Sequence, residues 1–204
     1  MAPARHLVVV AGGEPAATDA LATALRDDGT VRTAYSPDAL RESLDAEVDV
    51  VLVDVDLVDG PIDPLLTDVR AREFDCQVGV STPDPERTAA ETDAAVDAVV
   101  ERDRAAVRET VRWLAGRARY RARLEEFYDL SERRAELTGA DDDAARDRLD
   151  RQLDRLRRDL AELFDDLDEG SAFDAALAPD ERGFGPRGDG DIATDDSNDR
   201  TDGA

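Results

Sequence analysis

The chain has 204 residues and a formal net charge of -24, with a pI near 4.2, and arginine supplies all of its strong positive charge because lysine is absent. This length allows one domain of ordinary size with an appendage, or two small domains. The single cysteine excludes a disulfide within the chain, and every apolar stretch is shorter than the roughly 18 residues of a membrane span.

The acidic composition is typical of a salt-adapted protein. Carboxylate-rich surfaces stay hydrated in molar salt, where a Debye length of about 3 Å screens their mutual repulsion. The single Cys76 fits a reducing cytoplasm and the apolar stretches are too short for a membrane span, so we expect a cytoplasmic protein without a membrane segment. The charge argues against direct nucleic-acid binding, which depends on Lys and Arg, although molar salt weakens this argument.

Five apolar stretches predict the strands of one parallel sheet. The runs at 7–11 and 49–54 show little polar alternation and suit strands that helices cover on both faces, whereas 30–34 alternates like an outer strand. Segments with helical spacing lie between them, which predicts an α/β fold with a doubly wound five-stranded parallel sheet. The expected strands are 7–11, 30–34, 49–54, 76–80 and 96–100, and the expected helices are 16–25, 37–44, 62–74, 86–92 and a helix from 103.

The chain beyond Gly116 is helical and rich in Arg and Glu, without strand signals. One apolar stripe begins at Tyr120, and a turn is expected over 138–143. A second helix then repeats leucine at alternating spacings of four and three, which is the pattern of a coiled-coil seam. These leucines are Leu149, Leu153, Leu156, Leu160, Leu163 and Leu167. The pattern predicts an antiparallel α-helical hairpin, with self-association through the same coiled-coil seam as the rival interpretation.

These changes in character divide the chain into three parts. Residues 1–115 form the α/β domain, residues 116–177 the helical domain, and residues 178–204 a disordered acidic tail with almost no apolar residues.

Asp54 is the first functional candidate, because it ends the predicted central strand. In open α/β sheets, ligands and chemistry collect at the carboxyl ends of the strands. Ser81 follows the fourth strand and belongs to the same edge, with Thr82 next to it in case the register shifts by one residue.

This order of elements resembles the receiver domain of two-component response regulators, a flavodoxin-like fold. The acid after the third strand, the hydroxyl after the fourth and the long helix after the fifth carry the resemblance. The segment 120–130 and the leucine helix that follows are similar to the HalX-type domain found beside receivers in halophilic archaea. The resemblance implies that Asp54 stands at the phosphoacceptor position and Ser81 at the switch hydroxyl.

The sequence departs from the receiver pattern where metal and phosphate would bind. The expected acidic pair falls on Gly12 and Gly13, and the expected lysine falls on Glu101. Phosphoryl transfer to aspartate depends on a divalent cation held by carboxylates, so these changes predict a degenerate receiver without a metal or other cofactor. The alternative keeps magnesium, with Glu14 and Asp56 as substitute ligands and Arg102 in place of the lysine. A phosphate-cradling loop at Gly12–Gly13 is a further alternative with little support.

The resemblance implies an atypical response regulator rather than an enzyme. Its receiver-like domain would act without ordinary Asp phosphorylation, and its helical domain would bind a protein partner or self-associate. A sensor histidine kinase is a potential upstream partner. The alternative is a phosphorylatable regulator that controls transcription through DNA or a partner, although no helix-turn-helix pattern is visible.

Overall fold

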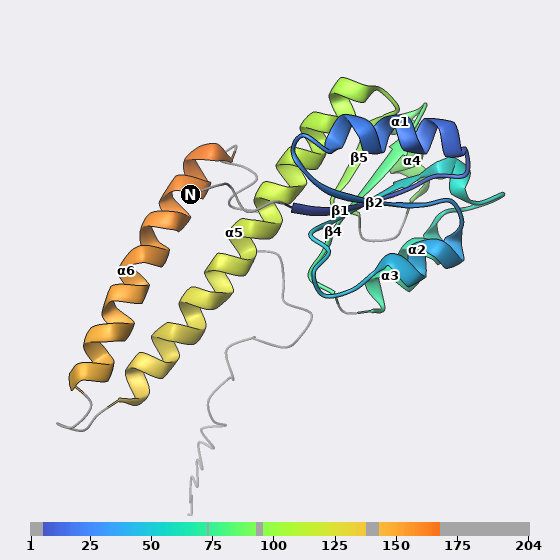
Figure 1. The fold of residues 1–204 in the computed structure, drawn as a ribbon. Helices are drawn as coiled ribbons and strands as arrows, with labels where there is room; N and C mark the ends of the chain where they lie inside the picture. Colours follow the sequence, from blue (N-terminus) through green and yellow to red (C-terminus); the bar gives the residue numbers. More distant parts are fainter. Residues whose placement is uncertain (1–5, 73, 93–95, 138–142, 168–204) are drawn as a thin grey trace, which may run out of the picture.

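The computed structural model describes residues 6–72, 74–92, 96–137 and 143–167 (Figure 1). Five strands form one parallel sheet in the order β2-β1-β3-β4-β5, and helices alternate with them along the chain. The strands are β1 His6–Ala11, β2 Gly29–Ala34, β3 Val50–Asp54, β4 Gln77–Thr82 and β5 Ala98–Glu101. The helices are α1 Pro15–Leu25, α2 Pro37–Ser43, the 3-10 turn η1 Val55–Leu57, α3 Asp63–Arg70, α4 Pro85–Glu91, α5 Arg104–Glu136 and α6 Asp143–Asp166. The predicted fold class is confirmed.

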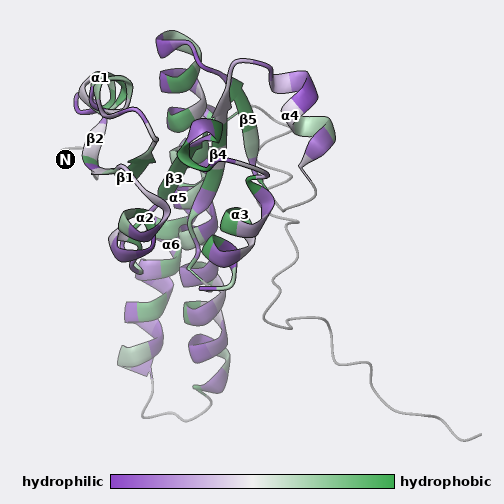
Figure 2. Ribbon diagram, turned by 90° about the vertical axis from the view of Figure 1, so that its right-hand side faces the viewer, coloured by the Kyte–Doolittle hydropathy of each residue, from purple (hydrophilic) through white to green (hydrophobic). Residues whose placement is uncertain are grey.

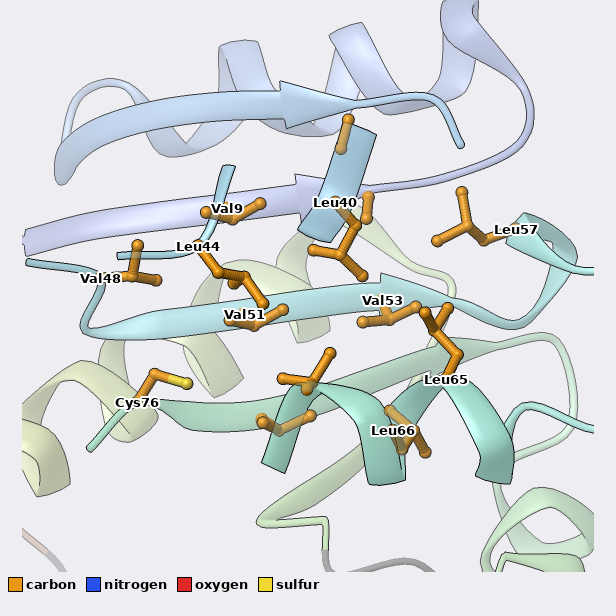
Figure 3. Packing of buried hydrophobic residues seen from close by; sticks show 14 of the residues in the cluster. Val9, Leu40, Leu44, Val48, Val51, Val53, Leu57, Leu65, Leu66 and Cys76 are labelled. Carbon is orange, nitrogen blue, oxygen red and sulfur yellow. The ribbon is translucent and has the colours of Figure 1, made fainter. Parts of the chain in front are cut away.

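Helices cover both faces of the sheet, which explains the unbroken apolar runs of its central strands. On one face, Val9, Val51 and Val53 pack with side chains of α2 and α3, including Leu40 and Leu66 (Figure 3). On the other face, a second cluster joins the sheet to α1 and α5. It consists of Val8, Val10, Leu25, Val50, Leu52, Val100, Val107, Val111, Leu114 and Ala115. Burial of apolar surface on both faces is the main stabilising contribution to this half of the chain.

Local sequence signals account for where the helices begin. Proline stands in the first turn of α1, α2, α3 and α4, where its missing N–H costs no helical hydrogen bond. The side chain of Ser36 accepts a hydrogen bond from Ala39 N, and that of Asp103 accepts from Ala105 N and Ala106 N. These caps satisfy backbone donors that have no partner within the helix.

Most predicted elements differ from the observed ones by one or two residues at an end, and α3 and β5 show why. The helix expected to reach residue 74 ends at Arg70, because Ala71 N bonds to Thr67 O and Val69 O in a tightened last turn; Phe74 follows the helix and still packs against the core. The strand expected from residue 96 begins at Ala98. Before it, the Asp97 carboxylate accepts hydrogen bonds from Arg70 Nη2 and from the Val78 N–H.

Helix α5 runs well past the sheet, and α6 packs beside its outer half (Figures 1 and 2). Arg134 Nε lies 2.9 Å from Asp150 Oδ1, and the Arg157 guanidinium lies 5.4 Å from the centroid of the Phe127 ring. A Cβ added at Gly116 would lie 3.0 Å from Leu167 Cδ2. These contacts show that the two helices run antiparallel, as the predicted hairpin requires.

The leucine seam of α6 faces α5. Leu153, Leu156, Leu163 and Leu167 are buried, and Leu149 and Leu160 are partly buried. Within this chain the seam is therefore occupied, and self-association through it stays a prediction. The proposed boundary between residues 115 and 116 falls inside the continuous helix α5. The predicted tail 178–204 and most of the predicted turn lie outside the described residues.

Among the residues that the structure describes, no helix is long and apolar enough to cross a membrane.

Candidate functional site

The candidate site lies at the carboxyl edge of the sheet, on the face covered by α1 and α5. Asp54 ends β3 and pairs in register with Ser81 of β4. Ser81 pairs in turn with Val100, two residues before Arg102. Side chains two positions apart along a strand share a face, so Leu52 and Asp54 point to the same side of the sheet. The topology thus brings together the predicted acid and hydroxyl.

Arg102 holds two carboxylates at this edge. Its Nη2 lies 2.6 Å from Asp54 Oδ1 and 2.7 Å from Asp56 Oδ2. The Arg102 N–H donates to Thr82 O at 2.8 Å, which fixes the backbone from which the side chain reaches across. One guanidinium therefore links the loop after β3 to the loop after β5.

Asp54 also shapes its own loop. Its Oδ1 accepts a hydrogen bond from the Asp56 N–H at 2.9 Å and so caps the short turn η1. Burial raises the pKa of Asp54, while the hydrogen bond from Asp56 N and the charge of Arg102 act in the opposite direction. Burial also opposes the charge of Arg102, but its bonds to Asp56 and Asp54 outweigh that effect and raise its pKa. The pair is thus a partly buried ion pair held by hydrogen bonds.

Glu101, on which the expected lysine position falls, does not line the cavity beside Asp54. It is exposed at the end of β5, while Val100 packs on the face of the sheet that carries Leu52. Alternation along the strand then turns Glu101 to the other side and brings Arg102 back toward Asp54. A cation is therefore present beside Asp54, one residue later in the chain than the resemblance places it.

The loop after β1 leaves no room for carboxylates at the two glycine positions. A Cβ at Gly12 would lie 2.5 Å from Thr18 Oγ1, whose hydroxyl donates to Glu14 O. A Cβ at Gly13 would overlap the backbone carbonyl of Asp56. The loops after β1 and β3 thus pack directly on one another where a receiver of the ordinary kind would place metal ligands.

The residues present do not fit a magnesium ion. Of the two substitute ligands, Asp56 is already paired with Arg102, which leaves Glu14 alone at the exposed start of α1. Across the described ranges, no group of three or more His, Cys, Asp and Glu side chains is arranged to hold a metal. The ammonium or guanidinium of a side chain can neutralise a carboxylate, but it cannot supply the coordination positions of a hard dication.

Ser81 and Thr82 occupy different environments. Ser81 is fully buried, and its Oγ has no hydrogen-bond partner among the described residues. Thr82 Oγ1 lies 2.8 Å from Thr88 Oγ1 and accepts from the Asp84 N–H at 3.3 Å. Because the Thr82 hydroxyl is hydrogen-bonded to Thr88 of α4, Ser81 carries the hydroxyl that is available to the site.

A cavity of about 260 Å³ adjoins these groups, between α1, the strand ends and the start of α5. Its wall is largely apolar, with the polar groups at one side and at the rim. Among its lining residues are Gly12, Thr18, Leu21, Leu52, Asp54, Ser81 and Arg104. Thr18 is a member of the site that sequence reasoning missed, because a threonine within a helix carries no signal of contact with the preceding loop.

No model of a known protein family and no curated protein matches the sequence. Solved structures do match in fold. A CheY-like response regulator receiver domain protein from Methanospirillum hungatei JF-1 superposes with a TM-score of 0.50 at 15% identity, covering 57% of this chain and 98% of that chain. An uncharacterized protein from Neptuniibacter caesariensis gives a TM-score of 0.51 at 17% identity, covering 58% and 94% respectively.

The described chain therefore has a CheY-like receiver fold followed by two long helices. At these identities the likeness concerns the fold alone.

Proposed function

We propose that this protein is an atypical response regulator of two-component signalling, in which the receiver-like half works without ordinary phosphorylation of Asp54. The observation that carries the proposal is the position of Arg102, which pairs with Asp54 and Asp56 where a phosphoryl group and its metal would be held. The packing at Gly12 and Gly13 supports it, because the usual acidic pair has no space there.

The helical half is the output in this proposal. Helix α5 begins against the site edge and continues as one helix into the hairpin, so a change at the edge has a rigid path to α6. The hairpin would act as a HalX-type interaction module in the cytoplasm of a salt-adapted organism. A sensor histidine kinase would be an upstream partner only if Asp54 accepted a phosphoryl group.

One observation favours the phosphorylatable alternative. Arg102 places a permanent positive charge 2.6 Å from Asp54 Oδ1, and such a charge would stabilise an anionic phosphoryl group nearby. In that case the protein would control transcription through a partner. Direct DNA contact has less support, because the net charge is -24 and the sequence shows no helix-turn-helix pattern.

Intact mass spectrometry tests the two candidates. The protein is incubated with acetyl phosphate and magnesium in molar salt, and we expect no mass increase of one phosphoryl group, since no carboxylate set is available to bind the metal. A stoichiometric increase that disappears in Asp54→Ala would reject the proposal and establish the alternative.

A further inference from the structure

The outer face of α6 carries a stripe of arginines. They lie at successive spacings of three, four and three, so they share one face of the helix, and all four are exposed. This arginine stripe consists of Arg148, Arg151, Arg155 and Arg158. The buried leucines of α6 occupy the opposite side, against α5. The arginine stripe therefore points away from the hairpin seam.

These arginines differ from their neighbours in having no carboxylate partner. Arg146 pairs with Asp143 and Arg157 with Asp154. Within the described part of the chain, by contrast, no ion pair involves any member of the arginine stripe, and Arg158 bonds only to the backbone oxygen of Asp154. Unpaired guanidinium groups gathered on one face are unusual in a chain with a net charge of -24.

The outer half of α5 carries a matching acidic stripe. The first half of this helix packs on the sheet through Val107, Val111, Leu114 and Ala118. Continuing the same three-and-four spacing beyond the sheet leads to carboxylates instead of apolar residues. This acidic stripe consists of the exposed residues Glu125, Asp129, Glu132 and Glu136. Of these, only Glu125 has an intrachain ion pair among the described residues, with Arg121 at 3.5 Å.

The two stripes occupy the same section of the hairpin. The Arg134–Asp150 ion pair and the Arg157–Phe127 contact set residues 127–134 alongside residues 150–157. The acidic stripe spans 125–136 and the arginine stripe spans 148–158, so both are centred on this section. They face away from each other, so the carboxylates and guanidiniums of one molecule cannot meet within it.

We propose that the hairpin binds a second copy of this chain, with the arginine stripe of one copy lying against the acidic stripe of the other. Four guanidiniums over about 15 Å of helix would lie along the acidic stripe, in which Glu125 already pairs with Arg121 and Asp129, Glu132 and Glu136 are left to form charge-assisted hydrogen bonds with the other copy. The interface is head-to-tail, so each added copy leaves one arginine stripe and one acidic stripe free.

A second copy fits these stripes better than a nucleic acid does. Asp147, Asp154 and Asp159 flank the arginine stripe, and the continuous phosphate charge of a nucleic acid would extend over them as well as over the arginines, whereas the acidic stripe is a single line of carboxylates. The same chain, in contrast, presents the complementary carboxylates at the matching place. This association specifies the partner of the hairpin in the proposed function, but it involves neither Asp54 nor phosphorylation, so the two proposals fail separately.

Sedimentation over a range of protein concentrations at one fixed ionic strength tests the interface. We expect the unmodified chain to associate with increasing concentration, and Arg151→Glu combined with Arg155→Glu to weaken the association at least tenfold. Arg26→Glu combined with Arg72→Glu is the matched control, because it changes the net charge equally at two exposed arginines of the receiver half that have no ion pair among the described residues. This control should associate more strongly than the stripe variant.

A charge-exchange experiment identifies the two faces. Asp129→Arg combined with Glu132→Arg should also reduce association, whereas mixing this variant with Arg151→Glu/Arg155→Glu should restore it, since each acidic face then meets a basic one. Circular dichroism should show equal helicity in all variants, and a loss of helicity would be answered with glutamine at the same positions. The inference is overturned if the unmodified chain stays monomeric, if the control weakens association equally, or if mixing restores nothing. Duplex DNA binding that requires Arg151 and Arg155 in a monomeric chain would assign the stripe to nucleic acid instead.

Discussion

Arg102 is the cation that pairs with Asp54. The carboxylate is partly buried at the end of β3, and burial alone would favour its protonated form. The guanidinium at 2.6 Å and the Asp56 N–H at 2.9 Å favour the ionised form. A carboxylate held in this way is already neutralised by a tethered cation, which a dissociable metal would have to displace.

The residues of this pair illustrate what sequence can predict at the smallest scale. Asp54 and Ser81 were found from their positions after two apolar runs, because the ends of adjacent parallel strands share one edge. The sequence suggests Arg102 as a cation beside Asp54 only in the alternative that keeps magnesium. Whether Glu101 or Arg102 faces Asp54 depends on the face to which Val100 packs, and a shift of one residue exchanges the two. The close contacts of Gly12 and Gly13 depend on loop packing that no local pattern specifies.

Gly13 offers a direct test of this loop packing. We expect Gly13→Asp to destabilise the protein by about 2 kcal/mol or more, because the new side chain overlaps the backbone carbonyl of Asp56. Gly60→Asp is the matched control, since nothing lies within 4 Å of a Cβ at Gly60. Chemical denaturation of both variants measures the difference. Equal stability of the two variants would mean that the loop after β1 yields easily and that an acidic pair could be restored.

At the scale of elements, the leucine seam holds the hairpin together. Leu156 is 5% exposed against α5. Leu156→Asp should therefore cost the helical half about 3 kcal/mol or more, since it buries an unpaired carboxylate in an apolar interface. Ala161→Asp places the same charge on an exposed position of α6 and should change stability little. Helicity measured by circular dichroism during thermal unfolding compares them, and a folded hairpin in Leu156→Asp would contradict the intrachain packing.

Two ion pairs attach α5 to the turn between α1 and β2. Asp28, after α1, accepts from Arg108 Nε at 2.6 Å and lies 2.7 Å from Arg112 Nη2. The hydrogen bond from Arg108, more than the one from Arg112, lowers the pKa of Asp28. A carboxyl group whose pKa is lower in the folded state contributes stability above its unfolded pKa of about 3.9 and loses it as the pH falls through the folded value.

Asp28→Asn tests this attachment. The variant should be less stable than the unmodified chain by up to about 1 kcal/mol at pH 7, the range of partly exposed ion pairs. The difference should shrink as the pH falls below about 4, because the carboxylate of the unmodified chain then becomes protonated. Denaturation curves at pH 7 and pH 3 measure both differences, and a difference independent of pH would show that the ion pairs contribute nothing.

At the scale of the whole molecule, α5 belongs to both halves. Its first part completes the core on one face of the sheet, and its outer part forms the hairpin with α6 (Figure 1). The sequence predicted both halves, because the apolar runs and the leucine repeat are strong signals. It also predicted a long last helix after the fifth strand, and α5 is one uninterrupted helix of 33 residues that continues where the composition changes near Gly116. This continuity makes the edge with Asp54 and the hairpin parts of a single structural unit.

If Arg102 and the packed loops leave no place for a metal-bound phosphoryl group at Asp54, an analogue of that group should not bind there. Beryllofluoride with magnesium imitates that group without requiring a reactive donor, and ¹⁹F NMR in molar salt reports its binding directly. We expect no bound fluoride resonance at any magnesium concentration. A stoichiometric bound resonance that depends on magnesium and is absent in Asp54→Ala would contradict this expectation.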